Sequence, residues 1–420
     1  MLAIIRNNSF LNKVMVVAGG TAAGQLIAAA SSPILSRLYS PNDFGVLAVY
    51  ASILSIITAI ASLRFEIAIP LPEKDEEAIK LLGLSLLCIV TMTAVSAAVL
   101  YALCDILLVW LKAENIRSYL WLLPIGLFFS GMYQALSFWC IRKEEFAVIA
   151  RTKFIQSLSA VIVQLFMSLM TAGPLGLIVG QIIGLSSGVN LFVRSVKQRW
   201  HLFSGIKLKD LSDTAKKYSN FFKYESPQVL INVIGQNIPQ LMLATSFGIT
   251  LSGFYLMAQK ILGYPIALVG NSFRQVYYQK AVIASRDGKL YQLARKSTKN
   301  LSLIILLPLL LTIIVAPDLF AVIFGDGWRK AGEYARYIAI WSAMGVVNIP
   351  ANAIIPILGV QRLYLIFEII YFLARVAAAV TAVSIGNDEF AIILIAAIGV
   401  IFNVILIFGV LHIAKLRKTK

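Results

Sequence analysis

The sequence predicts an all-α polytopic membrane protein with about twelve transmembrane helices. Apolar residues make up 59% of its 420 residues and charged residues 14%, whereas a soluble protein usually carries about 25% charge. Apolar runs of about 20 residues, long enough to cross a bilayer as a helix, recur along the whole chain. These runs are continuous and do not alternate with a period of two, which favours helices over barrel strands.

Twelve spans are expected in chain order. The first follows Arg6 and Lys13 and continues through Leu35 without a polar cleavage region, so we interpret it as a retained helix and not a signal peptide. The seventh begins at Ser226 and Pro227, a good N-cap followed by a good first helical residue. The predicted spans lie at about 14–36, 43–63, 79–102, 119–140, 148–171, 174–194, 226–248, 252–273, 300–323, 334–356, 363–385 and 389–413.

The longest hydrophilic stretch separates the sixth span from the seventh and divides the chain into two sets of six helices. We therefore expect an N-terminal six-helix lobe over residues 1–200 and a cytoplasmic linker over 201–225. A C-terminal six-helix lobe with a basic cytoplasmic tail follows over 226–420.

The positive charges predict the orientation of the chain. The net charge is +17, which in a soluble protein could indicate nucleic acid, but cytoplasmic loops of membrane proteins gather Lys and Arg. With both termini in the cytoplasm, 29 of the 37 Lys and Arg residues fall on the cytoplasmic side and six on the other. The sequence thus predicts a multi-pass protein of the cell (inner) membrane with cytoplasmic termini and no nucleic-acid partner.

A polar stripe runs along the seventh span. Gln228, Asn232, Gln236 and Gln240 are four residues apart and share one helix face, with Asn237 beside them. The stripe serves either helix–helix hydrogen bonding or the wall of a polar cavity. The first span has a weaker set that includes Gln25. Irregular polar helices at matching positions of two halves are typical of a transporter's substrate path.

Lys260 lies inside the apolar run of residues 253–271. This run aligns without gaps with residues 45–63, which suggests an internal repeat. A charge this deep in a span is costly, so Lys260 either pairs with a neighbouring helix or reaches the interface, or it serves as a cavity cation for an anionic substrate.

Other charged residues are candidates for the substrate cavity, the gate or coupling. Arg375 lies near the middle of the eleventh span, two turns after Glu368 on the same face. It is either part of a purely structural pair with Glu368 or a cavity or lobe-coupling candidate. Arg64, Glu66 and Arg274 are expected at cytoplasmic helix ends, where they either anchor the helices or close a gate by ion pairing. Glu225, just before the seventh span, is a weaker candidate for proton or cation coupling.

The sequence offers no chemistry for catalysis. Cys88, Cys104 and Cys140 fit no metal-ligand spacing and are expected to pack as small apolar residues. The sequence contains no nucleotide-binding loop and no nucleophile–base pair. We therefore expect a protein that is not an enzyme and has no metal site or cofactor, with coupling to H⁺ or Na⁺ left open.

Two stretches of the chain resemble bacterial polysaccharide flippases, the Wzx-type O-antigen and exopolysaccharide translocases. "SRLYSPNDFGVLAVYASIL" and "LRFEIAIPLPEKDEEAIKLLGLSLL" resemble the first helical hairpin of that family. "LATSFGITLSGFYLMAQKILGYPIALVGNSFRQVYYQKA" resembles the matching hairpin of its second half. The family belongs to the multidrug/oligosaccharidyl-lipid/polysaccharide (MOP) exporter superfamily.

The resemblance implies two six-helix lobes around a central cavity. It also implies a substrate in which an oligosaccharide repeat unit is carried on undecaprenyl pyrophosphate, with membrane lipids and other polysaccharide assembly proteins as further partners. The function it implies is flipping of this lipid-linked unit by alternating access for O-antigen or exopolysaccharide biosynthesis. The sugar is not implied, and no site residue is carried over from the family.

Three alternatives stay open at this point. A cation-coupled multidrug exporter of the same superfamily would be expected to hold a deep acidic residue, whereas the deep charges here are mainly basic. A lipid-linked peptidoglycan precursor flippase differs only in its substrate. A polysaccharide polymerase or ligase would need catalytic groups on the external face, where the predicted loops are short.

Overall fold

The computed structural model describes residues 9–111, 114–170, 173–197, 205 and 207–418. These residues form helices joined by short turns, and none of them is in a strand. They divide into two compact units, Met1–Asn237 and Ile238–Lys420, and we refer to these as unit 1 and unit 2. The predicted lobe and linker bounds stay a prediction beside this division.

Within the described residues, nine helical segments are long and apolar enough to cross a membrane. They coincide with nine of the twelve predicted spans. The other three predicted spans fall on α2 (Ser9–Leu38), on α10 (Ser226–Met242) with the π-helical turn η5 (Leu243–Phe247), and on α11 (Ile249–Arg286).

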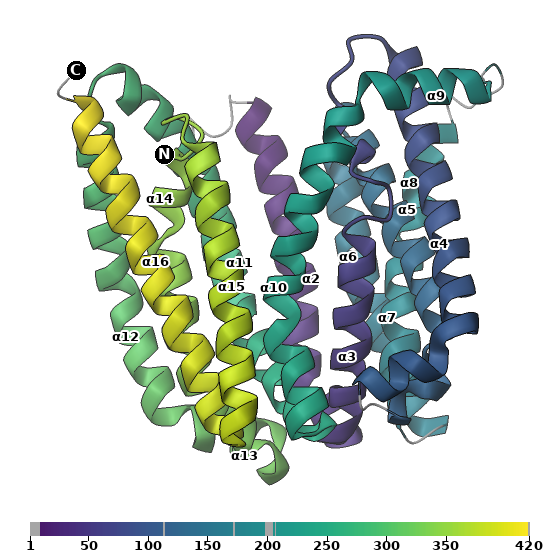
Figure 1. The fold of residues 1–420 in the computed structure, drawn as a ribbon, viewed down its shortest axis with the longest axis vertical. Coiled ribbons are helices and arrows are strands. Elements are labelled where there is room, and N and C mark those ends of the chain that lie inside the picture. Colours follow the sequence, from purple (N-terminus) through teal and green to yellow (C-terminus); the bar gives the residue numbers. More distant parts are fainter. Residues whose placement is uncertain (1–8, 112–113, 171–172, 198–204, 206, 419–420) are drawn as a thin grey trace. The chain divides into compact units, whose positions relative to one another are not determined.

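Unit 1 is a helical bundle (Figure 1). Its longer helices after α2 are α3 (Pro41–Thr58), α4 (Asp75–Leu111), α5 (Leu122–Arg142), α6 (Phe146–Met170), α7 (Leu175–Ser187), α8 (Val189–Lys197) and α9 (Leu208–Lys217). Short 3₁₀ turns η1 (Phe65–Ala68) and η2 (Glu114–Tyr119) flank α4, and the π-helical turn η4 (Phe221–Glu225) leads into α10.

Small residues bring the helices of unit 1 close together. A Cβ built on Gly20 of α2 would lie 2.5 Å from Cβ of Ala150 on α6, and one on Gly24 would lie 2.9 Å from Oγ of Ser157. Gly184 of α7 approaches Ala160 of α6 in the same way. Small residues at such contacts let backbones pack closely where the hydrophobic effect cannot drive helices together, as in a bilayer.

The start of α3 shows how local sequence sets a helix boundary. The side chain of Ser40 accepts a hydrogen bond from the Asp43 backbone N–H at 3.2 Å, and Asp43 Oδ2 accepts one from the Ser40 backbone N–H at 2.8 Å. Pro41 occupies the first turn, where its missing N–H is not needed. This capping box fixes the entry into the helix.

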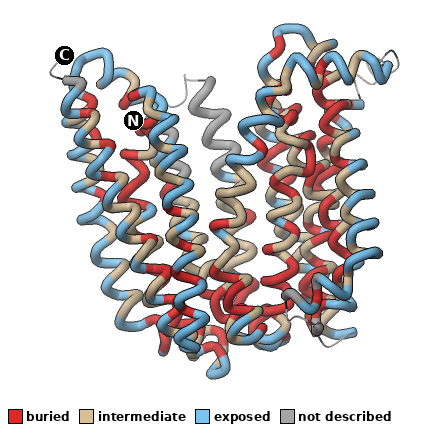
Figure 2. The backbone as a smooth tube through the Cα atoms, in the orientation of Figure 1, coloured by how far each residue is buried: buried red, intermediate tan, exposed pale blue. Residues whose placement is uncertain are grey.

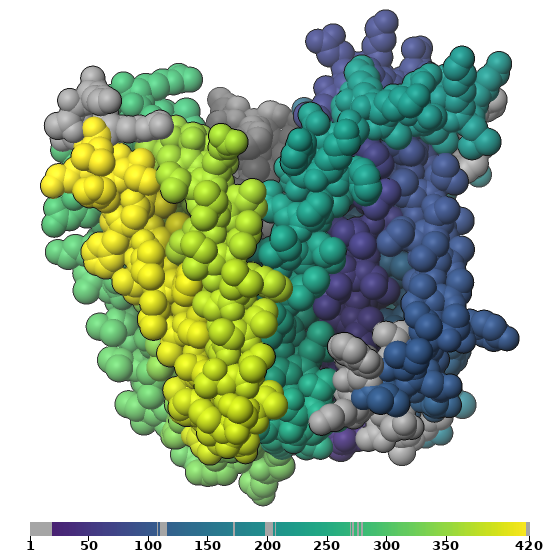
Figure 3. Space-filling model, in the orientation of Figure 1, coloured from purple at the N-terminus to yellow at the C-terminus, as the bar shows by residue number. Residues whose placement is uncertain are grey.

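Unit 2 contains the end of α10, η5, α11, α12 (Leu290–Phe324), η6 (Asp326–Trp328), α13 (Arg329–Val347), α14 (Ile349–Ile354), α15 (Gln361–Ile385) and α16 (Asp388–Lys418). Its core includes the buried side chains of Tyr255, Tyr334 and Trp328, and Trp328 meets Phe254 edge to face at 5.9 Å. Side chains of α15 and α16 cover the face of unit 2 in Figure 3.

Large apolar side chains are exposed along α12, as expected of a helix that faces lipid. Leu303, Ile304, Leu307, Leu311 and Ile314 are each more than half exposed. Figure 2 shows buried positions on the inner sides of the helices and exposed positions on their outer sides. In a soluble protein the exposed side chains of a helix are mostly polar, whereas those of α12 are apolar, as in a helix that is apolar all round.

Candidate functional site

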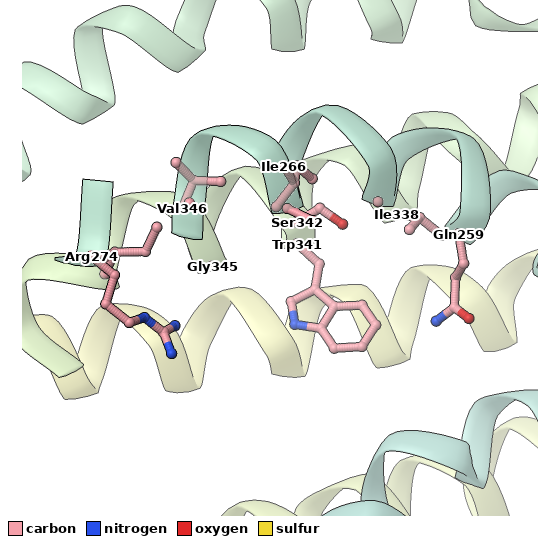
Figure 4. Close-up of a pocket in the computed structure, with 12 residues that line it drawn as sticks. Gln259, Ile266, Arg274, Ile338, Trp341, Ser342, Gly345 and Val346 are labelled. Atoms are coloured by element: carbon pink, nitrogen blue, oxygen red, sulfur yellow. The ribbon is translucent and has the colours of Figure 1, made fainter. Parts of the chain in front are cut away.

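An open pocket of about 530 Å³ lies in unit 2 between α11 and α13 (Figure 4). Pockets that bind small molecules typically have volumes of about 300–1,000 Å³. The described lining residues are Gln259, Gly263, Ile266, Ala267, Gly270, Arg274, Ile338, Trp341, Ser342, Gly345, Val346 and Ile349.

The spacing of the lining residues explains the shape of the pocket. On both α11 and α13 they recur every three or four positions, so one face of each helix is turned toward the pocket. Glycines occupy several of these positions. A Cβ built on Gly263 or Gly345 would meet nothing within 4 Å, so side chains leave this space open.

Polar groups lie at the two ends of the pocket, with Trp341 between them (Figure 4). Gln259 donates a hydrogen bond to the Tyr255 hydroxyl at 3.1 Å, which orients its amide. Arg274 is exposed at the other end, fifteen residues and roughly 22 Å further along α11. The pocket can therefore hold a ligand with hydroxyl groups at one end and a negative charge at the other.

Arg274 and Glu368, two of the predicted gate or coupling candidates, lie near a common neighbour in unit 2. Glu368 hydrogen-bonds the hydroxyl of Tyr364, and Arg274 lies close enough to influence that hydroxyl electrostatically. The helix α11 continues beyond Arg274 to Arg286, so Arg274 does not sit at a helix end as expected.

Arg375 is buried among aromatic rings next to the pocket. Only 8% of its surface is exposed, and its guanidinium lies 3.8 Å from the ring centroid of Tyr371 and 5.4 Å from that of Trp341. Tyr371 in turn stacks on Phe402 at 4.7 Å. Arg375 thus contacts Trp341, which lines the pocket, but is not itself among the described lining residues.

Lys260 follows Gln259 on α11, on the next face of the helix. Its side chain is half-buried, and it is not one of the described residues that line the pocket. The two interpretations made from the sequence, a paired lysine and a cavity cation, therefore both stay predictions.

The polar stripe of α10 divides into two parts. Gln236 is exposed and Asn232 half-buried, and Gln236 donates to the Asn232 side-chain oxygen at 2.6 Å. Gln240 is buried and donates to the Ser252 carbonyl at 2.6 Å and to its hydroxyl. The Gln240 end of the stripe thus serves packing of α10 against α11, whereas the Gln236 end is open.

Unit 1 holds the remaining candidates. Gln25 on α2 is half-buried, and its buried Oε1 has no hydrogen-bond partner among the described residues. Glu225 lies exposed in η4. No described contact brings these two residues together.

Arg64 and Glu66 differ most from the expectation. The helix α3 ends at Thr58, and both residues lie in the turns that follow, with Arg64 in the left-handed region at φ 64°. The Glu66 side chain is fully buried, accepts a hydrogen bond from Ser62 and lies 3.3 Å from the Arg64 guanidinium. The sequence left open an interfacial anchor or a gate that closes by ion pairing. The η1 turn folds Glu66 into the bundle beside Arg64, and the gate role stays a prediction.

A network of charged side chains joins α4, α5 and α9. Arg142 at the end of α5 and Lys143 directly after it pair with Asp75 at the start of α4. Lys217 and Tyr218, at the end of α9, both bond Glu77, and Lys80 lies 3.7 Å from Asp210. The hydrogen bond to Glu77 raises the pKa of Lys217. The sequence placed α9 in the hydrophilic linker but did not reveal these partners, which come from different helices.

Comparison with solved structures identifies the fold. The chain matches an inward-facing multidrug resistance MATE family transporter of the MOP superfamily with a TM-score of 0.69 and 14% identity, over 96% of each chain. It matches MATE in complex with MaL6 with a TM-score of 0.60 and 13% identity, over 97% of this chain and 96% of the other.

A third match is a MOP superfamily transporter from Pyrococcus furiosus whose binding pocket has reverse polarity, with a TM-score of 0.60 and 13% identity over 97% and 95% of the two chains. At these identities the likeness is one of fold alone. The fold is that of a two-lobed MOP-superfamily membrane transporter, which confirms the predicted fold class.

The family follows from the sequence itself. The family model for polysaccharide biosynthesis proteins matches residues 34–333, more than two thirds of the chain. The chain therefore belongs to the polysaccharide biosynthesis protein family, and the resemblance to flippases of the MOP superfamily is confirmed. The search of curated proteins finds no match. The solved structures that share the fold are described as transporters.

Proposed function

We propose that the protein flips polyprenyl-pyrophosphate-linked oligosaccharide repeat units across the cytoplasmic membrane by alternating access. The product would supply O-antigen or exopolysaccharide biosynthesis. Membership of the polysaccharide biosynthesis family supports a lipid-linked oligosaccharide as the substrate. In this proposal the protein lies in the inner membrane with both termini in the cytoplasm, as the distribution of Lys and Arg indicates.

The observation that carries this proposal is the positive charge at the unit 2 pocket. Arg274 is the one ionisable side chain among the described lining residues. Arg375, which is buried, adds a second cation directly behind Trp341. Cations in a site of low dielectric favour an anionic cargo, and a pyrophosphate or an acidic sugar provides that charge.

A cation-coupled multidrug exporter is the second candidate. Two observations favour it: the fold shared with proteins described as multidrug resistance MATE transporters, and the fully buried carboxylate of Glu66 in unit 1. Arg64 lies 3.3 Å from that carboxylate and balances its charge, so we rank this function below the first. A lipid-linked peptidoglycan precursor flippase would use the same site and would differ only in its cargo.

Deletion of the gene in its native host tests the proposal. We expect the host to accumulate a lipid-linked oligosaccharide on the cytoplasmic side and to lose surface polysaccharide, with sensitivity to cationic drugs unchanged. Accumulation of a peptidoglycan precursor would support the peptidoglycan alternative. Increased drug sensitivity with normal surface polysaccharide would overturn the proposal in favour of the exporter.

A further inference from the structure

Trp341 is the one aromatic side chain among the described residues that line the unit 2 pocket. Its indole extends between Gln259 and Arg274 (Figure 4). The ring is half-buried, and its N–H makes no hydrogen bond with a described residue. A large flat apolar surface is thus offered to whatever enters the pocket.

The indole is held in place from behind. A Cβ built on Gly399 of α16 would overlap the indole atoms Cδ1 and Nε1, so the ring rests directly on the backbone of α16. Arg375 lies 5.4 Å from the ring centroid and is itself packed on Tyr371. A ring fixed in this way loses little conformational freedom when a ligand binds, which favours affinity.

The space beside the ring is suited to a flat, polar ligand. Gly263 and Gly345 leave open space, so no side chain fills the pocket next to the indole. Gln259 and Ser342 supply an amide and a hydroxyl at its edge. Hydrogen-bonding side chains around an apolar surface fix the orientation of a bound molecule.

Sugars match this arrangement in both respects. One face of a pyranose ring presents C–H groups that pack against the negative face of an aromatic ring, while its hydroxyls project from the rim. A lipid tail would need no hydroxyl partners, and a bare phosphate would need no aromatic surface. The combination of Trp341, Gln259 and Ser342 therefore favours the carbohydrate part of a lipid-linked cargo.

We propose that Trp341 is the stacking platform for a sugar ring of the transported oligosaccharide, and that Gln259 and Ser342 bind its hydroxyls. This inference rests on the proposed function and assigns the sugar-recognition part of the substrate site to unit 2. Arg274, at the far end of the same pocket, then binds an acidic substituent or a phosphate.

The test compares binding of two lipids to the purified full-length protein. One is the undecaprenyl-pyrophosphate-linked oligosaccharide extracted from the native host, and the other is undecaprenyl pyrophosphate without sugar. We expect the wild-type protein to prefer the glycosylated lipid. Trp341→Leu should weaken binding of that lipid by about tenfold and leave binding of the sugar-free lipid within about twofold. The affinity of Trp341→Phe for the glycosylated lipid should lie between those of the wild type and Trp341→Leu.

Trp121→Leu is the matched control for loss of a tryptophan, because Trp121 is 61% exposed in unit 1. It should bind both lipids as the wild type does. An unchanged preference of Trp341→Leu for the glycosylated lipid would overturn the stacking platform and leave the flippase function intact. Equal affinity of the wild-type protein for the two lipids would do the same. A wild-type protein that binds neither lipid would overturn the proposed function and this inference together.

A second pair of variants tests the position of the indole ring without removing it. In Gly399→Ala the new methyl group must displace the indole, so binding of the glycosylated lipid should weaken while that of the sugar-free lipid is kept. In Gly409→Ala, on the same helix, the methyl group meets nothing within 4 Å, and binding should not change. Equal binding by both alanine variants would count against the proposed position of the sugar.

Discussion

Arg375 is a buried cation whose described contacts are aromatic rings and not carboxylates. No described carboxylate forms an ion pair with it, and its charge lies against Tyr371 and Trp341. A guanidinium is planar and weakly hydrated, so it can stack on rings at a smaller desolvation cost than an ammonium group. Arginine, and not positive charge alone, is therefore what this position requires.

Replacement of Arg375 by lysine should lower both stability and export. The ammonium group keeps the charge but cannot stack, and a cation–π contact is worth roughly 0.5–2 kcal/mol. The melting temperature of the purified protein and the amount of surface polysaccharide measure the two effects. Arg362→Lys, at an exposed position at the start of α15, should change neither. Wild-type behaviour of Arg375→Lys in both measurements would contradict this account.

Lys260 is expected to act through its charge during transport. Lys260→Ala and Lys260→Gln should insert at normal levels and export less polysaccharide, Lys260→Arg should keep most function, and Lys260→Glu should be worst because it repels an anion. Protein level and surface polysaccharide are measured together. A structural role predicts loss of the protein itself, since removal of one buried partner strands the other. Normal export by a stably inserted Lys260→Glu variant would rule out the cavity role.

At the scale of the element, α10 presents one stripe with two different environments. Single cysteines are introduced in a background without the three native ones. If the open end of the stripe lines a water-filled cavity, Gln228→Cys and Gln236→Cys should react with a small membrane-impermeant thiol reagent, whereas Gln240→Cys should be protected beside Ser252. Mass spectrometry of the labelled protein gives the extent of reaction. Equal protection at all three positions would mean that the whole stripe serves helix packing.

The helix α9 should stay docked on α4 through its ion pairs. Lys217 bonds Glu77, whereas no ion pair is described for its exposed neighbour Lys216. Lys217→Gln should make α9 more accessible to a protease than Lys216→Gln does, and high salt should reduce the difference because exposed pairs are screened. Equal cleavage of the two variants at low salt would show that the pair does not hold the helix.

The docking of α9 should also depend on pH. The Lys207 backbone N–H donates to Asp210 at 3.0 Å and, with Lys80 nearby, lowers the pKa of that carboxyl. Because the folded pKa lies below the unfolded one, this contribution is present above the unfolded value and is lost as pH falls through the folded value. Protease cleavage near α9 should therefore increase below about pH 4. Asp210→Asn should remove that part of the pH dependence.

For the whole molecule, the distribution of positive charge predicts the topology. A reporter that is active only in the cytoplasm should work when fused after Lys209, Lys289 or Lys420 and should fail after Asp326. Reporter activity in whole cells provides the measurement, with immunoblots to confirm that each fusion is made. Activity after Asp326 would place the turn between α12 and α13 on the wrong side and overturn the predicted orientation.

The helices could be predicted from the sequence because continuous apolar runs depend only on neighbours along the chain. The deep charges Lys260 and Arg375 were visible for the same reason. The site itself could not be predicted from the sequence. Trp341 and Arg375 lie 34 residues apart and meet only through the packing of α13 against other helices. The burial of Glu66 could not be predicted, since nothing in its local pattern indicates that η1 turns inward. Arg274, already a candidate from the sequence, lines the pocket, and Gln259 beside Lys260 was a further local signal that could have been used.

The division between the two units falls inside α10, between Asn237 and Ile238, one residue before Pro239. Proline has no N–H, so the helix lacks one backbone hydrogen bond at this point and bends there at the lowest cost. Gln228 lies eleven residues away, about 16 Å along the helix axis. A bend of about 20° at Pro239 moves it by about 6 Å. A small bend of α10 at Pro239 therefore displaces the first residues of the helix by a distance as large as a side chain.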